Sequence, residues 1–267
     1  MDDIVALERI EREAWRSLAA AAPPDFAQAV GLACEPMGDA LFMMASRIPA
    51  FQFNWLAGAS LATGGADLVS LAVARFREAG QDKFTVQIPP GPHGRQVIAR
   101  AESEGLAKHP LAWAKFRRAT ANAPRIDSPL IVREAAPDEA DLFAATAVAG
   151  FGMPPPMGAW LKQIVGRTGW RCFVSLFGDE PAGAAALFLQ GDYAWLGIGA
   201  TKPEMRKRGG QSALLARRLE EARRAGARVA VTETGVPQPG EPAPSCKNIL
   251  AAGFQIAYVR PNWAPRS

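Results

Sequence analysis

A run of arginine, lysine and glycine between two apolar segments is the part of this sequence best suited to chemistry. It extends from Ala200 to Leu215 and contains Arg206-Lys207-Arg208 followed by Gly209-Gly210. Small residues that open a helix leave several backbone N–H groups unpaired, at the positive end of the helix dipole. Glycine lets the main chain approach a ligand closely, and the basic side chains add positive charge. The segment therefore predicts a site for an anion, and for a diphosphate in particular.

The glycines of this segment follow neither of two common phosphate-binding motifs. A P-loop needs Gly-Lys-Ser/Thr and a dinucleotide site needs Gly-x-Gly-x-x-Gly, and the segment contains neither pattern. An ordinary basic helix start without a ligand is the alternative interpretation.

The strands that lead into the predicted site form a meander. Compact turn signals separate three apolar runs, residues 171–177, 182–189 and 193–199, which predicts three neighbouring antiparallel strands. The helix after the glycines has an apolar face formed by Leu215, Leu219 and Ala222. Glu220 can pair with Arg224 on this helix. The pattern places four arginines mostly outside: Arg217, Arg218, Arg223 and Arg224.

The two halves of the chain repeat one order of helices, strands and glycines. A helix ends at Gly80 in the first half and at Gly226 in the second, and a further glycine follows 25 and 27 residues later, at Gly105 and Gly253. This predicts an internal repeat, with chance similarity of generic αβ units as the alternative. Residues 123–129, rich in proline and polar side chains, are the predicted linker. The expected domains are 1–125 and 126–267.

The first half has no equivalent of the basic cluster. Its helix over residues 67–79, with Asp67 as the expected N-cap, follows Leu61-Ala62-Thr63-Gly64-Gly65-Ala66, which contains glycine but no basic residue. A weak phosphate site is conceivable there, and a site that has been lost is the favoured interpretation.

Composition narrows the class of protein. Hydrophobic residues make up 49% and charged residues 21% of the 267, which is typical of a globular protein. No apolar run approaches the ~20 residues of a membrane span, and Asp2-Asp3 stands where a signal peptide needs positive charge, so a cytoplasmic protein without a membrane partner is expected. The cysteines and histidines lack the spacing of a disulfide framework or metal site: Cys34, Cys172, Cys246, His93 and His109.

The charge balance gives weak support to a nucleic-acid partner. The net charge is +4 and the isoelectric point is about 9.2. Most of the arginine lies in residues 206–208 and the helix that follows, without a basic tail or interleaved aromatic residues, so a local anion site explains the charge better. Binding to nucleic acid would instead depend steeply on salt.

The segment before the long helix resembles the acyl-CoA-binding motif of GNAT acetyltransferases. That motif has Arg/Gln-x-x-Gly-x-Gly/Ala after a Val-x-Pro strand end, and here Thr201-x-Pro203 and Arg206-x-x-Gly209-x-Gln211 fill it, with Gln211 in place of the usual small residue. Residues 130–263 follow the family's order of elements, and residues 245–254 look like its late helix with a Gly-Phe ending. The resemblance implies an α/β (α+β) fold with two GNAT-like domains. Each would be a mixed, mostly antiparallel sheet flanked by helices, and the N-terminal domain would be degenerate.

The resemblance also implies which residues bind acetyl-CoA as co-substrate. A splayed strand over residues 198–201 would bind the pantetheine arm, and the basic turn would bind the diphosphate. In full, the predicted CoA-binding residues are Ile198, Gly199, Ala200, Thr201, Arg206, Lys207, Arg208, Gly209, Gly210, Gln211, Ser212 and Asn248. In tandem proteins of the family, a degenerate half shapes the acceptor cleft, and we adopt that role as a hypothesis for the first half.

The candidate catalytic residues are Glu233 and Tyr258. A general base has to deprotonate the amine, and Glu233 at the end of the central strand is the first candidate, with a solvated loop acid as the alternative. The family often has a tyrosine four residues before the late Gly, as the acid that protonates the leaving thiolate, and here Ile249 occupies that position. Tyr258, Ser245, water or Cys246 could substitute for it.

The sequence therefore leads to two functional hypotheses. The first is an N-acetyltransferase that moves an acetyl group from acetyl-CoA to a small amine in a ternary complex, without metal or nucleic acid. The second is a catalytically silent acyl-CoA-binding regulatory module, which the missing tyrosine and the degenerate first half favour.

Overall fold

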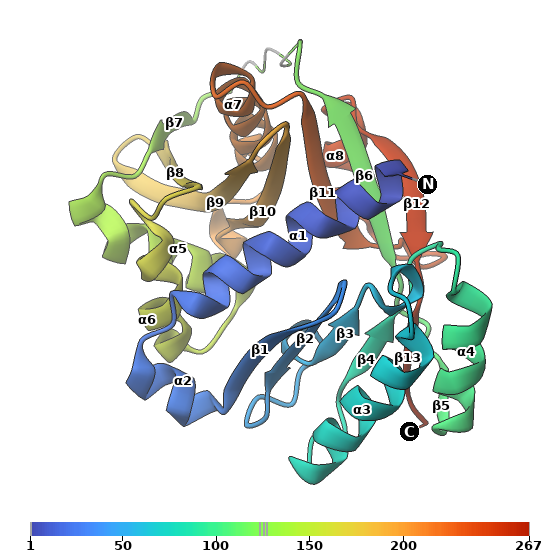
Figure 1. Ribbon diagram of the computed structural model, residues 1–267. Helices are drawn as coiled ribbons and strands as arrows, with labels where there is room; N and C mark the ends of the chain where they lie inside the picture. Colours follow the sequence, from blue (N-terminus) through green and yellow to red (C-terminus); the bar gives the residue numbers. More distant parts are fainter. Residues whose placement is uncertain (1, 123, 125, 127, 267) are drawn as a thin grey trace. The chain divides into compact units, whose positions relative to one another are not determined.

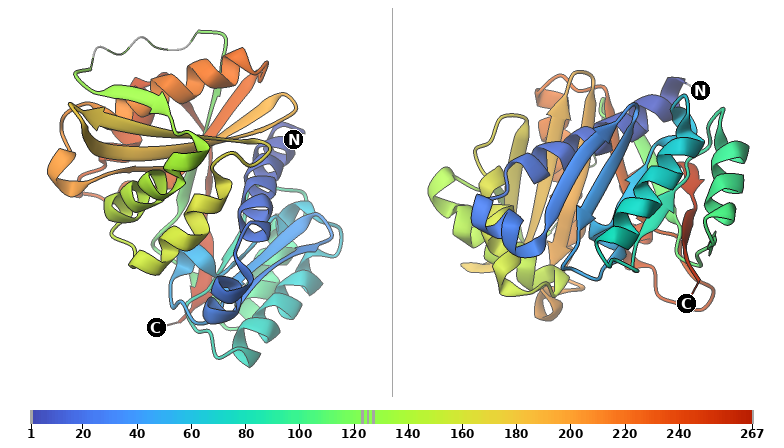
Figure 2. Two further views of the ribbon diagram at one scale, coloured as in Figure 1. Left: turned by 90° about the vertical axis from the view of Figure 1, so that its left-hand side faces the viewer. Right: turned by 60° about the horizontal axis from the view of Figure 1, so that its bottom comes forward.

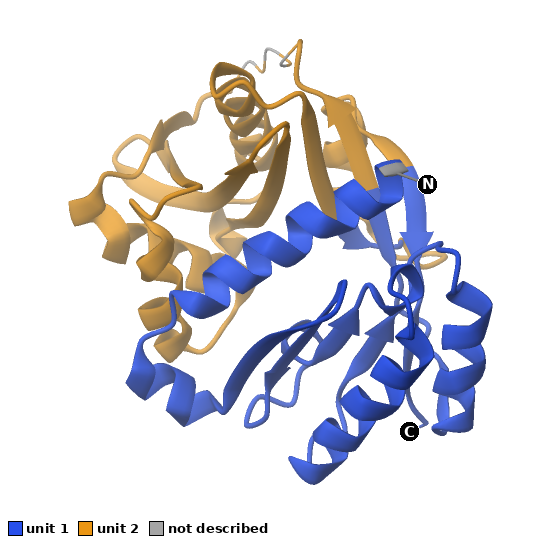
Figure 3. Ribbon diagram, in the orientation of Figure 1, with its two compact units in different colours: residues 1–115, 234–236, 257–267 blue, residues 116–233, 237–256 orange. Residues whose placement is uncertain are grey.

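The computed structural model describes residues 2–122, 124, 126 and 128–266. The protein is α+β, with two mixed, mostly antiparallel sheets that are each flanked by helices (Figure 1). The chain divides into two compact units (Figure 3). Unit 1 comprises residues 1–115, 234–236 and 257–267, and unit 2 comprises residues 116–233 and 237–256.

The first 120 residues form four helices and six strands within the described part of the chain. In chain order these are α1 (Asp2–Ala20), α2 (Pro24–Val30), β1 (Leu32–Met37), β2 (Ala40–Ala45), β3 (Trp55–Ala57), α3 (Gly65–Glu78), β4 (Thr85–Gln87), α4 (Gly94–Ser103), β5 (Leu106–Lys108) and β6 (Trp113–Ala119). A short 3₁₀ turn, η2 (Ala59–Leu61), precedes α3.

The sheet of unit 1 has six strands in the order β1-β2-β3-β4-β13-β5. Its strands pair antiparallel except for β3 and β4, which are parallel. Residues from α3 and α4 pack onto this sheet in one apolar core with Phe42, Phe76 and Phe84, all almost fully buried. The rings of Phe76 and Phe84 stack at a centroid distance of 4.4 Å. The apolar period of α3 and the alternation of β4 thus bury their apolar faces in a shared core.

The remainder of the chain contains the other helices and strands. They are β7 (Ile131–Glu134), α5 (Ala140–Phe151), α6 (Gly158–Leu161), β8 (Trp170–Phe177), β9 (Glu180–Gln190), β10 (Tyr193–Thr201), α7 (Gly210–Arg224), β11 (Val229–Gly235), α8 (Pro244–Ala251), β12 (Gln255–Arg260) and β13 (Asn262–Pro265). The predicted meander is therefore confirmed as β8, β9 and β10. Compact turns join these strands, which pair antiparallel.

The second sheet has seven strands in the order β12-β6-β11-β10-β9-β8-β7. Within it β10 and β11 are parallel, and α5 and α7 pack against β9 and β10 from opposite faces (Figure 2). Gly150 on α5 lies against the end of β10, since a Cβ built on it would be 2.7 Å from the Cβ of Ala200. The end of β10 is thereby held between two helices.

The two sheets have a similar arrangement of strands, and each contains one strand from the other half of the chain. In both, the strand before the long helix (β3 or β10) lies parallel to the strand after it (β4 or β11). The strand β6 lies between β11 and β12, and β13 lies between β4 and β5. The expected domain boundary at residue 125 stays a prediction. The two compact units do not test it, because unit 1 takes in residues from both halves of the chain. Residues 123, 125 and 127 of the predicted linker lie outside the described residues.

Two local predictions need correction, and one helix was not anticipated. Pro24 begins α2, because proline is favoured at the first turn of a helix. Gly64, not Asp67, is the N-cap of α3. Arg218 was expected on the outside of α7, but its side chain is almost fully buried. Among the described helices, none is long and apolar enough to cross a membrane.

Candidate functional site

The turn between β10 and α7 brings the predicted anion-binding residues together. Pro203 begins a 3₁₀ turn, Lys207 has a φ of 64°, and Gly209 is the N-cap of α7 with a φ of 81°. Glycine adopts this left-handed conformation without the clash that a Cβ would cause. The turn is therefore tight, and the first three residues of α7, Gly210, Gln211 and Ser212, follow it directly.

The start of α7 presents backbone donors that lie before its own ladder of hydrogen bonds. The first bond of the helical ladder here joins the N–H of Ala213 to the carbonyl of Gly209 at 3.0 Å. The N–H groups of Gly210, Gln211 and Ser212 precede that ladder, and the N-cap residue, Gly209, has no side chain that could accept from them. Since these groups lie at the positive end of the helix dipole, they favour a negatively charged ligand.

A cavity with a volume of about 690 Å³ lies at this helix start, within unit 2. This volume is within the ~300–1,000 Å³ of ordinary ligand sites. Its lining comprises Gly150, Phe151, Gly199, Ala200, Thr201, Met205, Arg206, Lys207, Gly209, Gly210, Gln211, Ser212, Pro244, Ser245 and Asn248. All of the predicted CoA-binding residues except Ile198 and Arg208 are in this set. The structure thus brings them together, and their binding of CoA stays a prediction.

The two neighbouring arginines of the turn have different surroundings. Arg206 lines the cavity, and its guanidinium donates to the carbonyls of Thr201 and Gly150, both at 3.4 Å. Arg208 does not line the cavity, and its guanidinium lies over the ring of Phe177 at 4.5 Å. The long bonds of Arg206 to neutral acceptors leave its charge available to a ligand, whereas Arg208 has an aromatic partner of its own.

The end of β10 separates from its parallel neighbour beside the cavity. Pairing of β10 with β11 ends at Trp195 and Val231, whereas pairing with β9 continues to Thr201. The register with β9 shifts between Gly197 and Ala200, and Ile198 within this bulge has a φ of 50°. The predicted splayed strand is therefore present as a bulged strand end whose last three residues line the cavity.

Glu233 lies on β11 just after the pairing with β10 has ended. Both carboxylate oxygens accept from the indole N–H of Trp195, at 3.1 and 3.0 Å, and the side chain is half-buried. Glu233 does not line the described cavity. The indole holds the carboxylate in one orientation, and the role of Glu233 as a general base stays a prediction.

Tyr258 belongs to a buried ionic cluster in unit 1, which we name the Glu8–Glu11 cluster after its two acids on α1. The Tyr258 hydroxyl donates to Glu8 at 2.6 Å, Arg260 donates to Glu8 and Glu11, and Lys115 donates to Glu11. Burial together with the charge of Glu8 raises the pKa of Tyr258 well above its ordinary value. Its proposed role as the acid for the leaving thiolate has no support from these surroundings.

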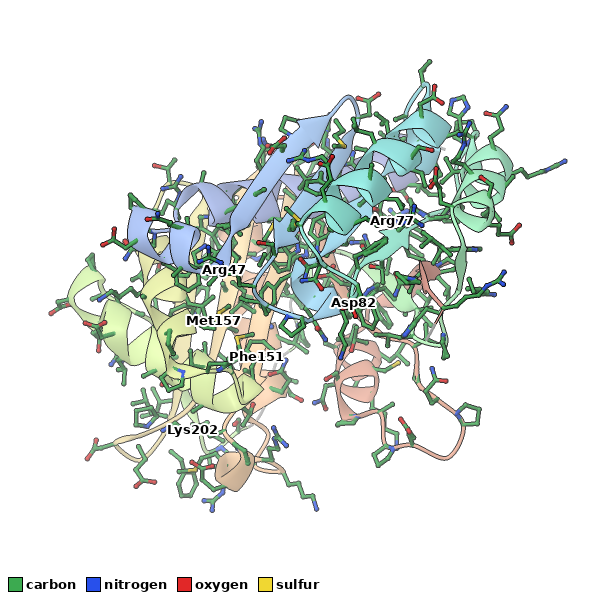
Figure 4. All side chains as sticks on the ribbon, turned by 90° about the horizontal axis from the view of Figure 1, so that it is seen from below. Arg47, Arg77, Asp82, Phe151, Met157 and Lys202 are labelled. Carbon is green, nitrogen blue, oxygen red and sulfur yellow. The ribbon has the colours of Figure 1, made fainter. Side chains whose placement is uncertain are left out.

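Sequence analysis missed several residues of the cavity wall. Gly150, Phe151, Met205 and Pro244 line it, and Ser245 was named only as a possible acid. Phe151 ends α5 and is labelled in Figure 4. The residue is 44% exposed. A signal was available in the run Gly150-Phe151-Gly152 at the end of an apolar helix, because such glycines permit close approach of a neighbouring strand.

Comparisons with known proteins identify the fold but no sequence family. No family model and no curated protein matches the chain. A GCN5-related N-acetyltransferase from Kribbella flavida is similar at a TM-score of 0.59 and 11% identity, covering 94% of this chain and 95% of that one. One from Sphaerobacter thermophilus is similar at a TM-score of 0.57 and 15% identity, covering 78% and 72%.

A third similar structure is a tandem GNAT protein from the clavulanic acid biosynthesis pathway. Its TM-score is 0.53 at 17% identity, covering 76% of this chain and 71% of that one. Together these structures show that the chain has a two-sheet, GNAT-like fold, and the predicted resemblance is confirmed at the level of the fold.

Proposed function

We propose that the protein is an acyl-CoA-dependent N-acetyltransferase that moves an acetyl group from acetyl-CoA to an amine of a small molecule. The observation that carries this proposal is the cavity at the start of α7, where the N-cap Gly209 offers no side-chain cap, bounded by Arg206, Lys207 and the separated end of β10. These features provide donors and positive charge for a diphosphate, and next to them a strand edge for an amide-containing arm.

In this proposal the N–H groups of Gly210, Gln211 and Ser212 bind the diphosphate, and Arg206 and Lys207 add charge. The strand end over residues 198–201 pairs with the pantetheine arm and polarises the thioester carbonyl, and Asn248 on α8, which also lines the cavity, adds a polar contact. The bulge supports this assignment because it turns β10 away from β11 and so leaves room along one edge.

The proposed chemistry is a direct transfer. The amine nitrogen, after losing a proton to Glu233 or to water, attacks the thioester carbon, so that a C–N bond forms while the C–S bond breaks and the electron pair leaves on sulfur. An acyl-enzyme is disfavoured because no cysteine lines the described cavity. In addition, burial raises the pKa of the Cys172 thiol well above its ordinary value.

A second candidate function is a silent acyl-CoA-binding module. It is favoured by the described lining, which contains no tyrosine, cysteine, histidine or carboxylate that could act as an acid or base. Ile249, in the position where the family often has its tyrosine, is buried. In this case acyl-CoA would bind without turnover.

The test combines binding with turnover. Calorimetric titration with CoA and with pantetheine, which lacks the diphosphate, is expected to show binding of CoA and much weaker binding of pantetheine. Incubation with acetyl-CoA and a panel of small amines is then expected to release free thiol. Binding without thiol release would support the silent module, and an absence of CoA binding would exclude both functions. Acetyl label trapped on Cys172 or Cys246 would contradict direct transfer.

A further inference from the structure

A buried arginine fills the gap that the bulge makes between β9 and β10. The Nη1 of Arg218 donates to the carbonyl of Ala186 on β9 at 3.1 Å and to that of Gly197 on β10 at 3.0 Å, and its Nε donates to Leu214 at 3.1 Å. A bulge interrupts the ladder and removes strand partners from nearby groups. Arg218 supplies a donor to the carbonyl at which the interruption begins, so it holds the bulge in its shape.

The positive charge of Arg218 has no carboxylate partner among the described residues. Its acceptors are three neutral carbonyls, and only 1% of the residue is exposed. The acids of the same helix have other partners, since Glu220 pairs with Arg223 and Arg224, and Glu221 pairs with Arg171, Arg217 and Arg224. Burial lowers the pKa of Arg218 to about 9, which leaves it charged at neutral pH. An unpaired buried charge destabilises a fold, and its presence here calls for a role.

The guanidinium of Arg218 lies directly behind the wall of the cavity. A Cβ built on Gly199 would be 3.3 Å from its Nη2 and 2.9 Å from the side-chain nitrogen of Gln211, and both Gly199 and Gln211 line the cavity. The charged residues of the described lining are Arg206 and Lys207, both at the turn into α7. Arg218 is therefore a cation in direct contact with the bulged part of β10, where the proposed function places the thioester.

We infer that Arg218 is a positioning residue that holds the β10 bulge and whose charge stabilises the thiolate of CoA as the C–S bond breaks. This inference rests on the proposed function. The described lining holds no tyrosine, cysteine, histidine or carboxyl group to protonate the sulfur, so a fixed positive charge in a poorly solvated wall would take the place of such a proton donor. The electron pair stays on sulfur, the amine proton goes to Glu233 or water, and the thiolate takes its proton from solvent after release.

The thiol of bound CoA reports this charge directly. At saturating CoA, ultraviolet absorbance of the thiolate is followed against pH for the wild-type protein and for free CoA, whose thiol has an ordinary pKa of ~8.5. The thiol pKa of CoA bound to the wild-type protein is expected to lie about one unit lower. Arg218→Gln, which keeps a donor and removes the charge, should abolish this difference, whereas Arg218→Lys should keep most of it. Arg223→Met, on the exposed face of α7, serves as the matched control and should behave as wild type.

The outcomes separate this inference from the function on which it rests. If the wild-type protein does not bind CoA, the proposed function fails. If it binds CoA but the bound thiol titrates as in free CoA, or if Arg218→Gln keeps the difference, the inference fails while the function stands. Should neither Arg218 variant fold, Arg206→Ala at saturating CoA decides. If the thiol pKa is still lowered in Arg206→Ala, the result supports Arg218 as the source of the shift. If the shift disappears in this variant, the effect belongs to Arg206 and the inference is overturned.

Discussion

The two long helices, α3 and α7, begin in the same way and end up with different surroundings. Each has a glycine N-cap in the left-handed conformation, Gly64 with a φ of 70° and Gly209 with a φ of 81°, followed by a second glycine. At α3, a Cβ built on Gly65 would be only 1.9 Å from the carbonyl oxygen of Ala59 in η2. At α7, the nearest atom to a Cβ on Gly210 would be a methyl carbon of Leu130, 3.2 Å away.

The chain itself covers the first helix start and leaves the second open. The N–H of Gly65 donates to Ala62 at 3.2 Å, and Ser60 in η2 is tied to the following loop through a bond from its hydroxyl to Pro89 at 2.7 Å. In addition, β3 stays paired with β4 to its last residue, Ala57, whereas β10 continues beyond its pairing with β11. At α7, where the strand separates and the preceding turn stays off the helix, the fold leaves an open cavity.

The largest expected effect comes from adding one methyl group at the second glycine of each helix. Gly65→Ala should lower the free energy of unfolding by about 3 kcal/mol, because the new Cβ meets backbone that cannot move away. Gly210→Ala should cost less than ~1 kcal/mol, since its neighbour is the flexible end of a leucine. Unfolding in urea measures both. Equal losses would mean that the two helix starts are equally filled.

Acid should act on unit 1 through the Glu8–Glu11 cluster. Burial pushes the pKa of Glu11 upward, but the charges of Arg260 and Lys115 outweigh burial and hold this pKa at about 2. Because the pKa of Glu11 is lower in the folded protein, its ionisation stabilises the fold at pH values above the unfolded-state pKa of about 4.5. This stabilisation is lost as the pH falls from about 4.5 to about 2. The loss should be about 3 kcal/mol. Glu11→Gln should lose stability already at pH 7, and Glu13→Gln, on the same helix but partly exposed, should behave as wild type.

Removal of one arginine should weaken ligand binding near the start of α7 but not on α3. Arg206→Ala should weaken binding of acetyl-CoA by about 10- to 100-fold, as expected for a charge-assisted contact of ~1.5–3 kcal/mol. Arg77→Ala on α3 is the matched control, because its exposed side chain pairs with Glu104, and affinity should not change. Calorimetric titration gives both values. An unaltered affinity in Arg206→Ala would show that the diphosphate binds elsewhere.

The smallest pair of effects concerns the two N-cap glycines. Gly64→Ala and Gly209→Ala each force an alanine into the left-handed region, which should cost about 1–2 kcal/mol of stability. No described atom lies within 4 Å of a Cβ on Gly64, and the nearest to one on Gly209 is 3.5 Å away, so neither variant adds a clash. Thermal unfolding should therefore shift alike in both, while only Gly209→Ala should weaken binding of acetyl-CoA. A loss of binding in Gly64→Ala would assign a ligand role to the first half.

Local signals predicted most of the elements and much of the candidate site. The meander was predictable because its turn residues separate apolar runs, and the turn into α7 because its glycines and arginines are adjacent in sequence. The burial of Arg218 was not predictable. Its acceptors, the carbonyls of Ala186 and Gly197, lie on two strands beside a β-bulge, and the apolar period of the helix carries no information about that bulge. Helix α2 was not predicted, because a proline can end a helix as well as begin one. The placement of β6 and β13 depends on pairing between residues far apart in the chain.

The position of β13 determines when the sheet of unit 1 can be completed during synthesis. Its partners β4 and β5 end at Gln87 and Lys108, more than 150 residues before Pro265. Until β13 has been synthesised, a gap separates these two strands in the strand order. Strand edges without a partner expose N–H and C=O groups that attract other chains. The sheet of unit 1 therefore stays incomplete until β13 has been synthesised, and a chain terminated before β13 would expose unpaired strand edges to chaperones and to its own copies.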